Sequence, residues 1–201
     1  MAAAIDYYFA AQSPWAYLGH ERFLRIVRDT GAQVRVRPAD YGKVFPVSGG
    51  LPLPKRAPQR QAYRLVELKR FSDFLGVPMN LQPRFFPVNP DDASRLIIAV
   101  ERDDGAGAAL AISGAIFAAV WRQERDIASP DVLGELLAEC GLPADRLERS
   151  REPAVQQLYE ANTQAAIDAG VFGAPSYVVN GEVFWGQDRL DFLERKLRSF
   201  N

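Results

Sequence analysis

The first third of the chain changes from a strand-like to a helix-like pattern and back. Residues Ile5–Phe9 are rich in aromatic side chains and precede a polar turn, which predicts a short buried strand. The segment 13–31 begins with Ser13-Pro14, carries apolar residues at helical spacing and stops at a glycine, so we expect a helix. Residues 33–38 alternate apolar and charged side chains. They predict a second strand, parallel to the first if the unit is βαβ.

A proline-rich stretch and a block of helices follow. Residues 39–58 contain four prolines and three glycines with little periodicity, and we expect an irregular surface loop there. Helical spacing then covers 60–75 and 153–169, and two or three further helical patterns lie between residues 91 and 138. The middle of the chain is therefore expected to be helical.

The C-terminal part predicts a hairpin and a last helix. Two short apolar runs flank Asn180-Gly181, a dipeptide typical of tight β-turns, and a helix is expected from Gln187. The order βαβ, helices, ββα is that of a thioredoxin-like α/β fold, although periodicity alone also allows other α/β folds. We expect residues 1–58 and 170–201 to form the thioredoxin-like domain. Residues 59–169 would then form an inserted helical subdomain with its connecting helix.

Composition narrows the class of protein. The 201 residues are 48% hydrophobic and 24% charged, which predicts one ordered folding unit. The formal net charge is −1, so we expect no nucleic-acid partner. The N-terminal residues lack the pattern of an export signal, and no apolar run reaches membrane-spanning length. A cytoplasmic protein without membrane association is expected.

The single cysteine and the single histidine limit the chemistry further. Cys140 has no partner for an intramolecular disulfide, and its segment predicts a helix end followed by Gly141. With His20 as the one histidine, a zinc site would need to be built almost wholly from carboxylates, so no metal site is expected. We interpret Cys140 as a small buried hydrophobe and His20 as part of a helix. Neither is a candidate catalytic residue.

Three local motifs could carry chemistry, and each also has a purely structural interpretation. Ser13, at a predicted helix N-terminus, either caps the helix or stabilises an anion such as a thiolate. Pro175 either opens a strand in trans or, with a cis bond, leaves the Ala174 backbone free to pair with an extended peptide. Asp188 either caps the last helix or accepts a ligand ammonium. Local sequence leaves all three open.

Together these motifs resemble the kappa-class glutathione transferases and especially the 2-hydroxychromene-2-carboxylate isomerases. The resemblance spans nearly the whole chain and rests on DYYFAAQSPWAYL near the start and GVFGAPSYVVNGEVFWGQDRLDFL near the end, with weaker support from RPADYGKVF and ANTQAAIDAGVFG. Wider relatives are disulfide oxidoreductases of the DsbA type, whose C-x-x-C motif is replaced here by SPWA, starting at Ser13. The resemblance implies a thioredoxin-like fold of this type with a large helical insertion.

The resemblance also implies reduced glutathione as the cofactor. Ser13 would donate a hydrogen bond to its sulfur and, with the helix N-terminus, stabilise the thiolate. The backbone of Ala174, before a cis Pro175, would pair with the cysteinyl part of glutathione. Gln187 and Asp188 would hold its γ-glutamyl end.

Basic and aromatic residues are implied or suggested for the remaining groups. Arg60 stands where the family usually places a lysine near the glycyl carboxylate of glutathione. Lys43 either meets a substrate carboxylate or is simply solvated. Aromatic side chains that either line an apolar substrate pocket or belong to the core are Trp15, Phe45, Phe85 and Phe86.

Two further sequence features concern the predicted loop over residues 39–58 and the helix that follows it. The family loop usually reads Gly-Asn before its prolines, whereas this chain has Ser48-Gly49-Gly50, and the missing amide leaves the substrate open. A run of basic residues follows, which we interpret as a water-facing helix surface whose first turn alone borders the site. The run consists of Lys55, Arg56, Arg60, Arg64, Lys69 and Arg70.

The implied reaction is a glutathione-dependent isomerisation of 2-hydroxychromene-2-carboxylate to trans-o-hydroxybenzylidenepyruvate, or of a close analogue in aromatic catabolism. A homodimer is implied as well. One alternative is a kappa-like transferase or peroxidase that consumes glutathione, and another is a non-catalytic thioredoxin-fold binding module. The presence of Ser13, Pro175 and Asp188 together disfavours the module. A disulfide oxidoreductase is disfavoured because Cys140 lies far from the redox position and has no resolving partner.

Overall fold

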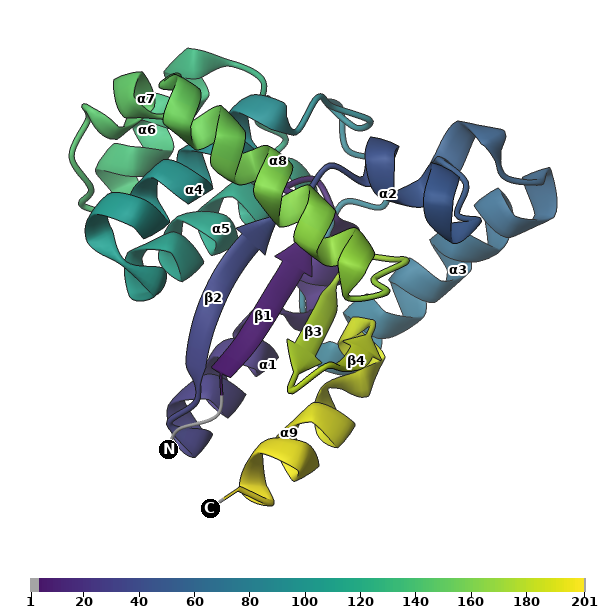
Figure 1. Ribbon diagram of the computed structural model, residues 1–201. Helices are drawn as coiled ribbons and strands as arrows, with labels where there is room; N and C mark the ends of the chain where they lie inside the picture. Colours follow the sequence, from purple (N-terminus) through teal and green to yellow (C-terminus); the bar gives the residue numbers. More distant parts are fainter. Residues whose placement is uncertain (1–3, 201) are drawn as a thin grey trace.

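The computed structural model describes residues 4–200, in which four strands form one mixed sheet. The strand order is β2-β1-β3-β4; β1 and β2 run parallel, whereas β3 is antiparallel to both β1 and β4 (Figure 1). The strands are β1 Ala4–Phe9, β2 Gln33–Pro38, β3 Ser176–Val179 and β4 Glu182–Trp185. The N-terminal and C-terminal parts of the chain therefore share one sheet, as the sequence predicts.

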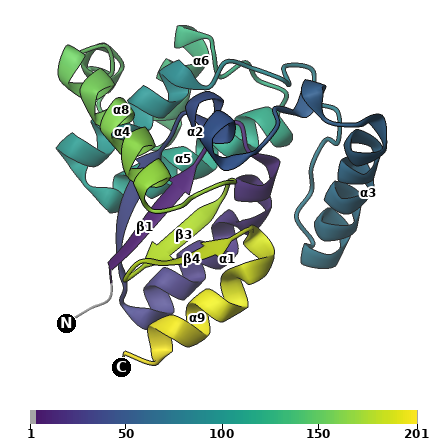
Figure 2. The same cartoon turned by 45° about the vertical axis from the view of Figure 1, so that its right-hand side comes forward.

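Helices cover this sheet and extend beyond it. The longer helices are α1 Pro14–Thr30, α2 Tyr41–Ser48, α3 Pro58–Leu75, α4 Asp91–Asp104, α5 Ala106–Trp121, α6 Pro130–Glu139, α8 Pro153–Asp168 and α9 Leu190–Arg198. The short ones are α7 Arg146–Arg149 and the 3-10 helices η1 Leu53–Lys55 and η2 Gln187–Arg189. In Figure 1, α8 passes in front of the sheet and α1 behind it, while α3 projects to the side in both views (Figure 2). Among residues 4–200, none of the helices has both the length and the apolar character of a membrane span.

Aromatic side chains from β1, β3 and α1 form the centre of the core. The ring of Tyr7 stacks on that of Tyr177 in the neighbouring strand, with 5.1 Å between centroids. Phe23 of α1 packs against both rings, at 4.7 Å and 4.8 Å. All three side chains are fully buried, and each such residue contributes about 1.5–3 kcal/mol through burial. This packing fixes α1, and hence its N-terminus, against the sheet.

The expected loop over residues 39–58 is wrong in part, because α2 and η1 lie within it. Asp40 caps α2 by accepting a 2.8 Å hydrogen bond from the backbone N–H of Gly42, and the helix ends at Gly49, whose φ is 75°. Tyr41 and Val44 of this helix are buried against β1 and α8 residues. Their burial stabilises a short helix that the glycine and proline content disfavours.

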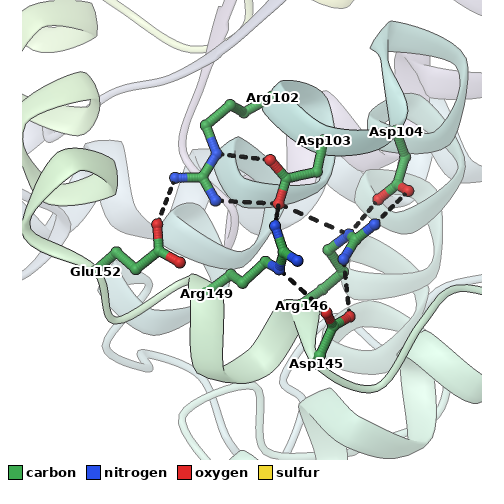
Figure 3. Close-up of polar contacts among 7 residues, drawn as sticks. All are labelled: Arg102, Asp103, Asp104, Asp145, Arg146, Arg149 and Glu152. Carbon is green, nitrogen blue, oxygen red and sulfur yellow. Dashed lines mark hydrogen bonds and ion pairs between the residues drawn. The ribbon is translucent and has the colours of Figure 1, made fainter.

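A polar network joins the end of α4 to α7 and the start of α8 (Figure 3). Arg146 binds both carboxylate oxygens of Asp104, at 2.7 Å and 2.9 Å. Arg102 bridges Asp103 and Glu152. Bidentate pairs of this kind are stronger than single contacts between mobile surface charges. The network therefore connects α4, α7 and α8, which belong to the helical segment between β2 and β3 in the sequence.

Candidate functional site

Ser13 lies at the junction of β1 and α1 and is only 6% exposed. Its backbone N–H donates to the carbonyl of Ala10 at 2.9 Å, and its Oγ accepts a 3.2 Å hydrogen bond from the N–H of Ala16. Ser13 is thus the N-cap of α1, with Pro14 in the first helical position. Its hydroxyl hydrogen has no acceptor among residues 4–200, so it remains available to a ligand. The partial positive charge of the helix N-terminus favours an anion at this point.

The segment before β3 lies beside this junction. Ser176 pairs with Tyr8 in the sheet, which places Pro175 next to the end of β1. The Ala174–Pro175 peptide bond is cis. The carbonyl of Gly173 accepts hydrogen bonds from Tyr41 Oη at 3.1 Å and from Ser176 Oγ at 2.7 Å. Within the described chain the backbone of Ala174 forms no hydrogen bond, so its N–H and C=O are available for pairing.

The turn into η2 completes the same end of the sheet. The N–H of Gly186 donates a 2.8 Å hydrogen bond to the carbonyl of Pro175. Gln187 is 1% exposed, and its side-chain carbonyl accepts a 3.2 Å hydrogen bond from Arg22 Nη1 of α1. The backbone carbonyl of Gln187 accepts from the same Arg22 Nη1 at 3.4 Å. The side chain of Gln187 therefore turns into the fold, and its backbone N–H is the part left for a ligand.

Asp188 is the acidic residue nearest to this turn. Its carboxylate forms a 2.7 Å ion pair with Arg189, and its side chain is 44% exposed. It makes no capping hydrogen bond to η2 or to α9, whose N-cap residues are Gly186 and Arg189, so the interpretation of Asp188 as the cap of the last helix is wrong. The Asp188 carboxylate also lies against Gly186, where a β carbon would collide with it. The carboxylate is thus held beside the Pro175 segment but stays open to solvent.

Two basic residues singled out from the sequence are exposed on the helices that follow β2. Arg60 is exposed in the first turn of α3, and Lys43 is exposed on α2. No ion pair or side-chain hydrogen bond joins either of them to Ser13, Ala174 or Asp188 in residues 4–200. The structure therefore brings Ser13 and the Pro175 segment together, while the two cations remain free side chains at neighbouring helices.

Two of the aromatic candidates, Trp15 and Phe45, pack against other rings. Trp15 meets Phe71 of α3 edge-on at 5.9 Å, and Phe45 packs 5.6 Å from the ring of Tyr41. Gly50 lies directly against the Phe45 ring, so a side chain at residue 50 would require the ring to move. Phe45 thus occupies the space that a loop asparagine at residue 50 would need.

Sequence reasoning placed Arg64 on a water-facing surface, and the structure corrects this. The Arg64 guanidinium carbon lies 5.1 Å from the centre of the Phe86 ring and 5.6 Å from that of Trp121. Its Nη2 is buried without a hydrogen-bond partner in the part of the chain that the structure describes. Burial, followed by the charge of Arg56, lowers the pKa of Arg64 to about 10. The sequence offers no direct signal, because both rings come from distant segments.

His20 and Cys140 form no hydrogen bond or ion pair with these groups in residues 4–200. His20 is 3% exposed, forms a 3.0 Å hydrogen bond between Nε2 and the carbonyl of Leu110, and has its pKa lowered to about 4 by burial. Cys140 is half-buried at the end of α6, where burial and then the charge of Glu139 raise the pKa of its thiol. A thiol held neutral in this way is a poor nucleophile. Both residues are structural, as their sequence context predicts.

Comparison with known proteins identifies the family. Residues 4–198 match the model of the DSBA-like thioredoxin domain. A 2-hydroxychromene-2-carboxylate isomerase of Sphingobium xenophagum is 31% identical over 98% of this chain and 99% of its own. The chain belongs to this family of isomerases within the DSBA-like thioredoxin proteins.

Two further relatives bear on the fold and the chemistry of the family. The solved structure of a 2-hydroxychromene-2-carboxylate isomerase superposes with a TM-score of 0.80, at 27% identity over 98% of this chain and 95% of that one. Glutathione S-transferase kappa 1 of Homo sapiens is 25% identical over 96% of this chain and 90% of its own. The predicted thioredoxin-like fold of the DsbA and kappa type is therefore confirmed.

Proposed function

We propose that this isomerase-family protein is a glutathione-dependent isomerase of 2-hydroxychromene-2-carboxylate or of a close aromatic analogue. The observation that carries the proposal is Ser13, a buried hydroxyl with a free hydrogen at the N-terminus of α1. A helix N-terminus and a hydroxyl donor together stabilise a thiolate. The names of the relatives support the reaction, since proteins named 2-hydroxychromene-2-carboxylate isomerase and glutathione S-transferase kappa 1 both align with nearly the whole chain.

The described residues fit the chemistry of glutathione. The free N–H and C=O of Ala174 suit the peptide groups around its cysteinyl residue, in the manner of strand addition. The Asp188 carboxylate suits the ammonium of the γ-glutamyl end, next to the backbone of Gln187. Arg60, exposed at the start of α3 and without an ion pair in residues 4–200, suits the glycyl carboxylate.

The protein's own residues would position the substrate ring and lower the pKa of the glutathione thiol. Bound glutathione would supply a thiolate that adds reversibly to an electrophilic carbon of the substrate. Ser13 would donate a hydrogen bond to that sulfur and so lower the pKa of the thiol. The half-buried Trp15 and Phe45 would limit water around the substrate ring and hold it in place. Cys140 takes no part, because it lies at the end of α6.

A transferase that consumes glutathione is the second candidate. The kappa-class relative, which aligns with 96% of the chain, favours it. The two activities differ in stoichiometry, because an isomerase regenerates glutathione whereas a transferase removes one glutathione for each substrate. Measuring free thiol during turnover separates them.

The test of the proposal begins with calorimetric titration of reduced glutathione into the purified protein. The absorbance of the thiolate is followed in parallel as pH is varied. We expect binding with a thiol pKa below that of free glutathione, and conversion of the chromene carboxylate only when glutathione is present. The absence of binding at millimolar glutathione, or conversion that does not depend on it, would contradict the proposal.

A further inference from the structure

Arg64, on the inner side of α3, has no counter-ion in the described part of the chain. Its guanidinium carbon lies 5.1 Å from the centre of the Phe86 ring and 5.6 Å from that of Trp121, and these two rings lie 4.8 Å apart. Nη2 is buried and makes no hydrogen bond within residues 4–200. Cation–π contact offsets part of the cost of burying this charge but leaves the N–H groups unsatisfied. A half-buried guanidinium whose donors have no protein acceptor among the described residues is suited to an anionic ligand.

The charges near Arg64 are also positive. The charge of Arg56 lowers the pKa of Arg64, and that of Arg60 lowers the pKa of Arg56, after burial in each case. Glu67, the next acidic residue along α3, is engaged by Arg70 at 2.6 Å. No carboxylate pairs with Arg64 among the described residues. A ligand anion would therefore be attracted by several neighbouring cations at once.

This cation is connected through Trp121 to the loop that carries Ser13. Trp121, which contacts Arg64, donates a 3.2 Å hydrogen bond from Nε1 to the carbonyl of Gln12. The side chain of Gln12 in turn accepts a 3.1 Å hydrogen bond from the N–H of Val88, close to Phe86. The two rings that contact Arg64 are thus connected to Gln12, the residue directly before Ser13, by a hydrogen bond from Trp121 and by one from Val88 close to Phe86.

We propose that Arg64, on the shelf formed by Phe86 and Trp121, binds the carboxylate of the aromatic substrate and so selects for carboxylate-bearing rings. The planar fork of the guanidinium matches a carboxylate with two parallel hydrogen bonds. The half-buried Phe86 ring offers an apolar surface for the rest of the ligand, while the fully buried Trp121 supports the guanidinium from within. This inference rests on the proposed function only for the identity of the substrate. Arg60 remains assigned to glutathione, so the two cations serve different anions.

The test uses a stable probe and needs no glutathione. Binding of 2-naphthoate and of its neutral analogue 2-naphthamide is measured by calorimetry for the wild type and for Arg64→Gln, Arg64→Lys and Lys69→Gln. Lys69 is the matched control, because it is an exposed cation of the same helix, paired only with Asp73. We expect the wild type to prefer naphthoate, Arg64→Gln to lose about tenfold or more in naphthoate affinity, and Lys69→Gln to resemble the wild type. Arg64→Lys should fall between them, since it keeps the charge but loses the fork.

Equal wild-type affinity for the two probes would overturn the proposal, and this comparison needs no variant to fold. Unchanged naphthoate binding in Arg64→Gln, or an equal loss in Lys69→Gln, would overturn it too. Glutathione is titrated separately into the same proteins. Naphthoate selectivity without glutathione binding would contradict the proposed function and support the Arg64 site. Glutathione binding without naphthoate selectivity would support the proposed function and contradict the Arg64 site. In turnover, Arg64→Gln should raise KM for the carboxylate substrate more than it lowers kcat.

Discussion

A β carbon added at Gly19 would lie 2.7 Å from the β carbon of Gln187 and 3.4 Å from its α carbon. Helix α1 and the turn into η2 therefore touch backbone to backbone at this point. Arg22, one turn further along α1, holds the same residue through its side chain and its carbonyl. Because Gly186 also donates to Pro175, this contact sets the position of the turn beside the candidate site.

Replacing Gly19 with alanine should push η2 away from α1. We expect Gly19→Ala to destabilise the protein by about 1–3 kcal/mol through overpacking, despite the better helix propensity of alanine. Glutathione affinity should fall as well, if the proposed function holds. The control is Gly134→Ala in α6, where nothing lies within 4 Å and a gain of up to about 1 kcal/mol is expected. Equal unfolding midpoints for the two variants in urea would show that the α1–η2 contact is not tight.

Removing the Ser13 hydroxyl should separate helix capping from thiolate stabilisation. We expect Ser13→Ala to lose about 1 kcal/mol of stability as a cap, to raise the pKa of bound glutathione and to lower kcat more than glutathione affinity. Ser13→Thr keeps a hydroxyl and should restore part of each property. Unchanged turnover and thiol pKa in Ser13→Ala would remove Ser13 from the site.

Ser129 provides a matched control for that experiment. Like Ser13 it is the N-cap residue of a helix and precedes a proline, but it makes no side-chain capping hydrogen bond. Ser129→Ala should therefore change neither turnover nor the thiol pKa. A loss of activity in Ser129→Ala would mean that the assay responds to destabilisation of the fold and not to changes in the site.

The ionisation of His20 should be visible in solution, because it is the one histidine of the chain. Its pKa of about 4 in the folded protein lies below the value of 6.5 expected when unfolded. The unfolded chain therefore binds the proton first, and stability falls as pH drops from 6.5 towards 4, by about 2 kcal/mol down to pH 5. NMR of the ring protons should show no titration above pH 5.5, and His20→Gln should flatten the stability profile in this range. A midpoint near 6.5 in the folded protein would contradict this assignment.

The Asp104–Arg146 pair should stabilise the helical block except in acid. Hydrogen bonds from Arg146 hold the pKa of Asp104 below its usual range. A lowered folded-state pKa means that the stabilisation is present above the unfolded value near 3.9 and is lost as pH falls through the folded pKa. We expect Asp104→Asn to lower the melting temperature by a few degrees at pH 7, and the difference from the wild type to shrink below pH 4. Asp73→Asn, in an exposed pair with Lys69, should have little effect at either pH.

Much of the fold could be predicted because local signals agree with the tertiary structure. Asn180 and Gly181 both have positive φ, as the hairpin between β3 and β4 requires. Ser13 and Pro14 begin α1 as the sequence indicates. Helix α2 was missed because its boundary signals, Asp40 and Gly49, were outweighed by the surrounding prolines and glycines. What stabilises α2 is burial against distant residues, which a local pattern does not contain.

The candidate site could be predicted only where a motif fixes the backbone. The positions of Ser13 and Pro175 follow from the ends of strands, and the pairing of Tyr8 with Ser176 brings them together. The orientation of Gln187 depends on Arg22, which belongs to another helix. Arg64 likewise depends on rings far away in the sequence. Side-chain direction at such positions is decided by packing between elements.

Because Gly50 and Phe45 are in direct contact, a substitution at one of these residues requires a substitution at the other. An amide cannot be installed at residue 50 while the phenyl ring stays in place, and shrinking the ring alone would leave a gap beside the loop. Redesign of substrate preference at this edge therefore requires both residues to change in one step. A library that varies one residue at a time would not contain this double substitution. A library that combines small residues at position 45 with polar residues at position 50 would contain it.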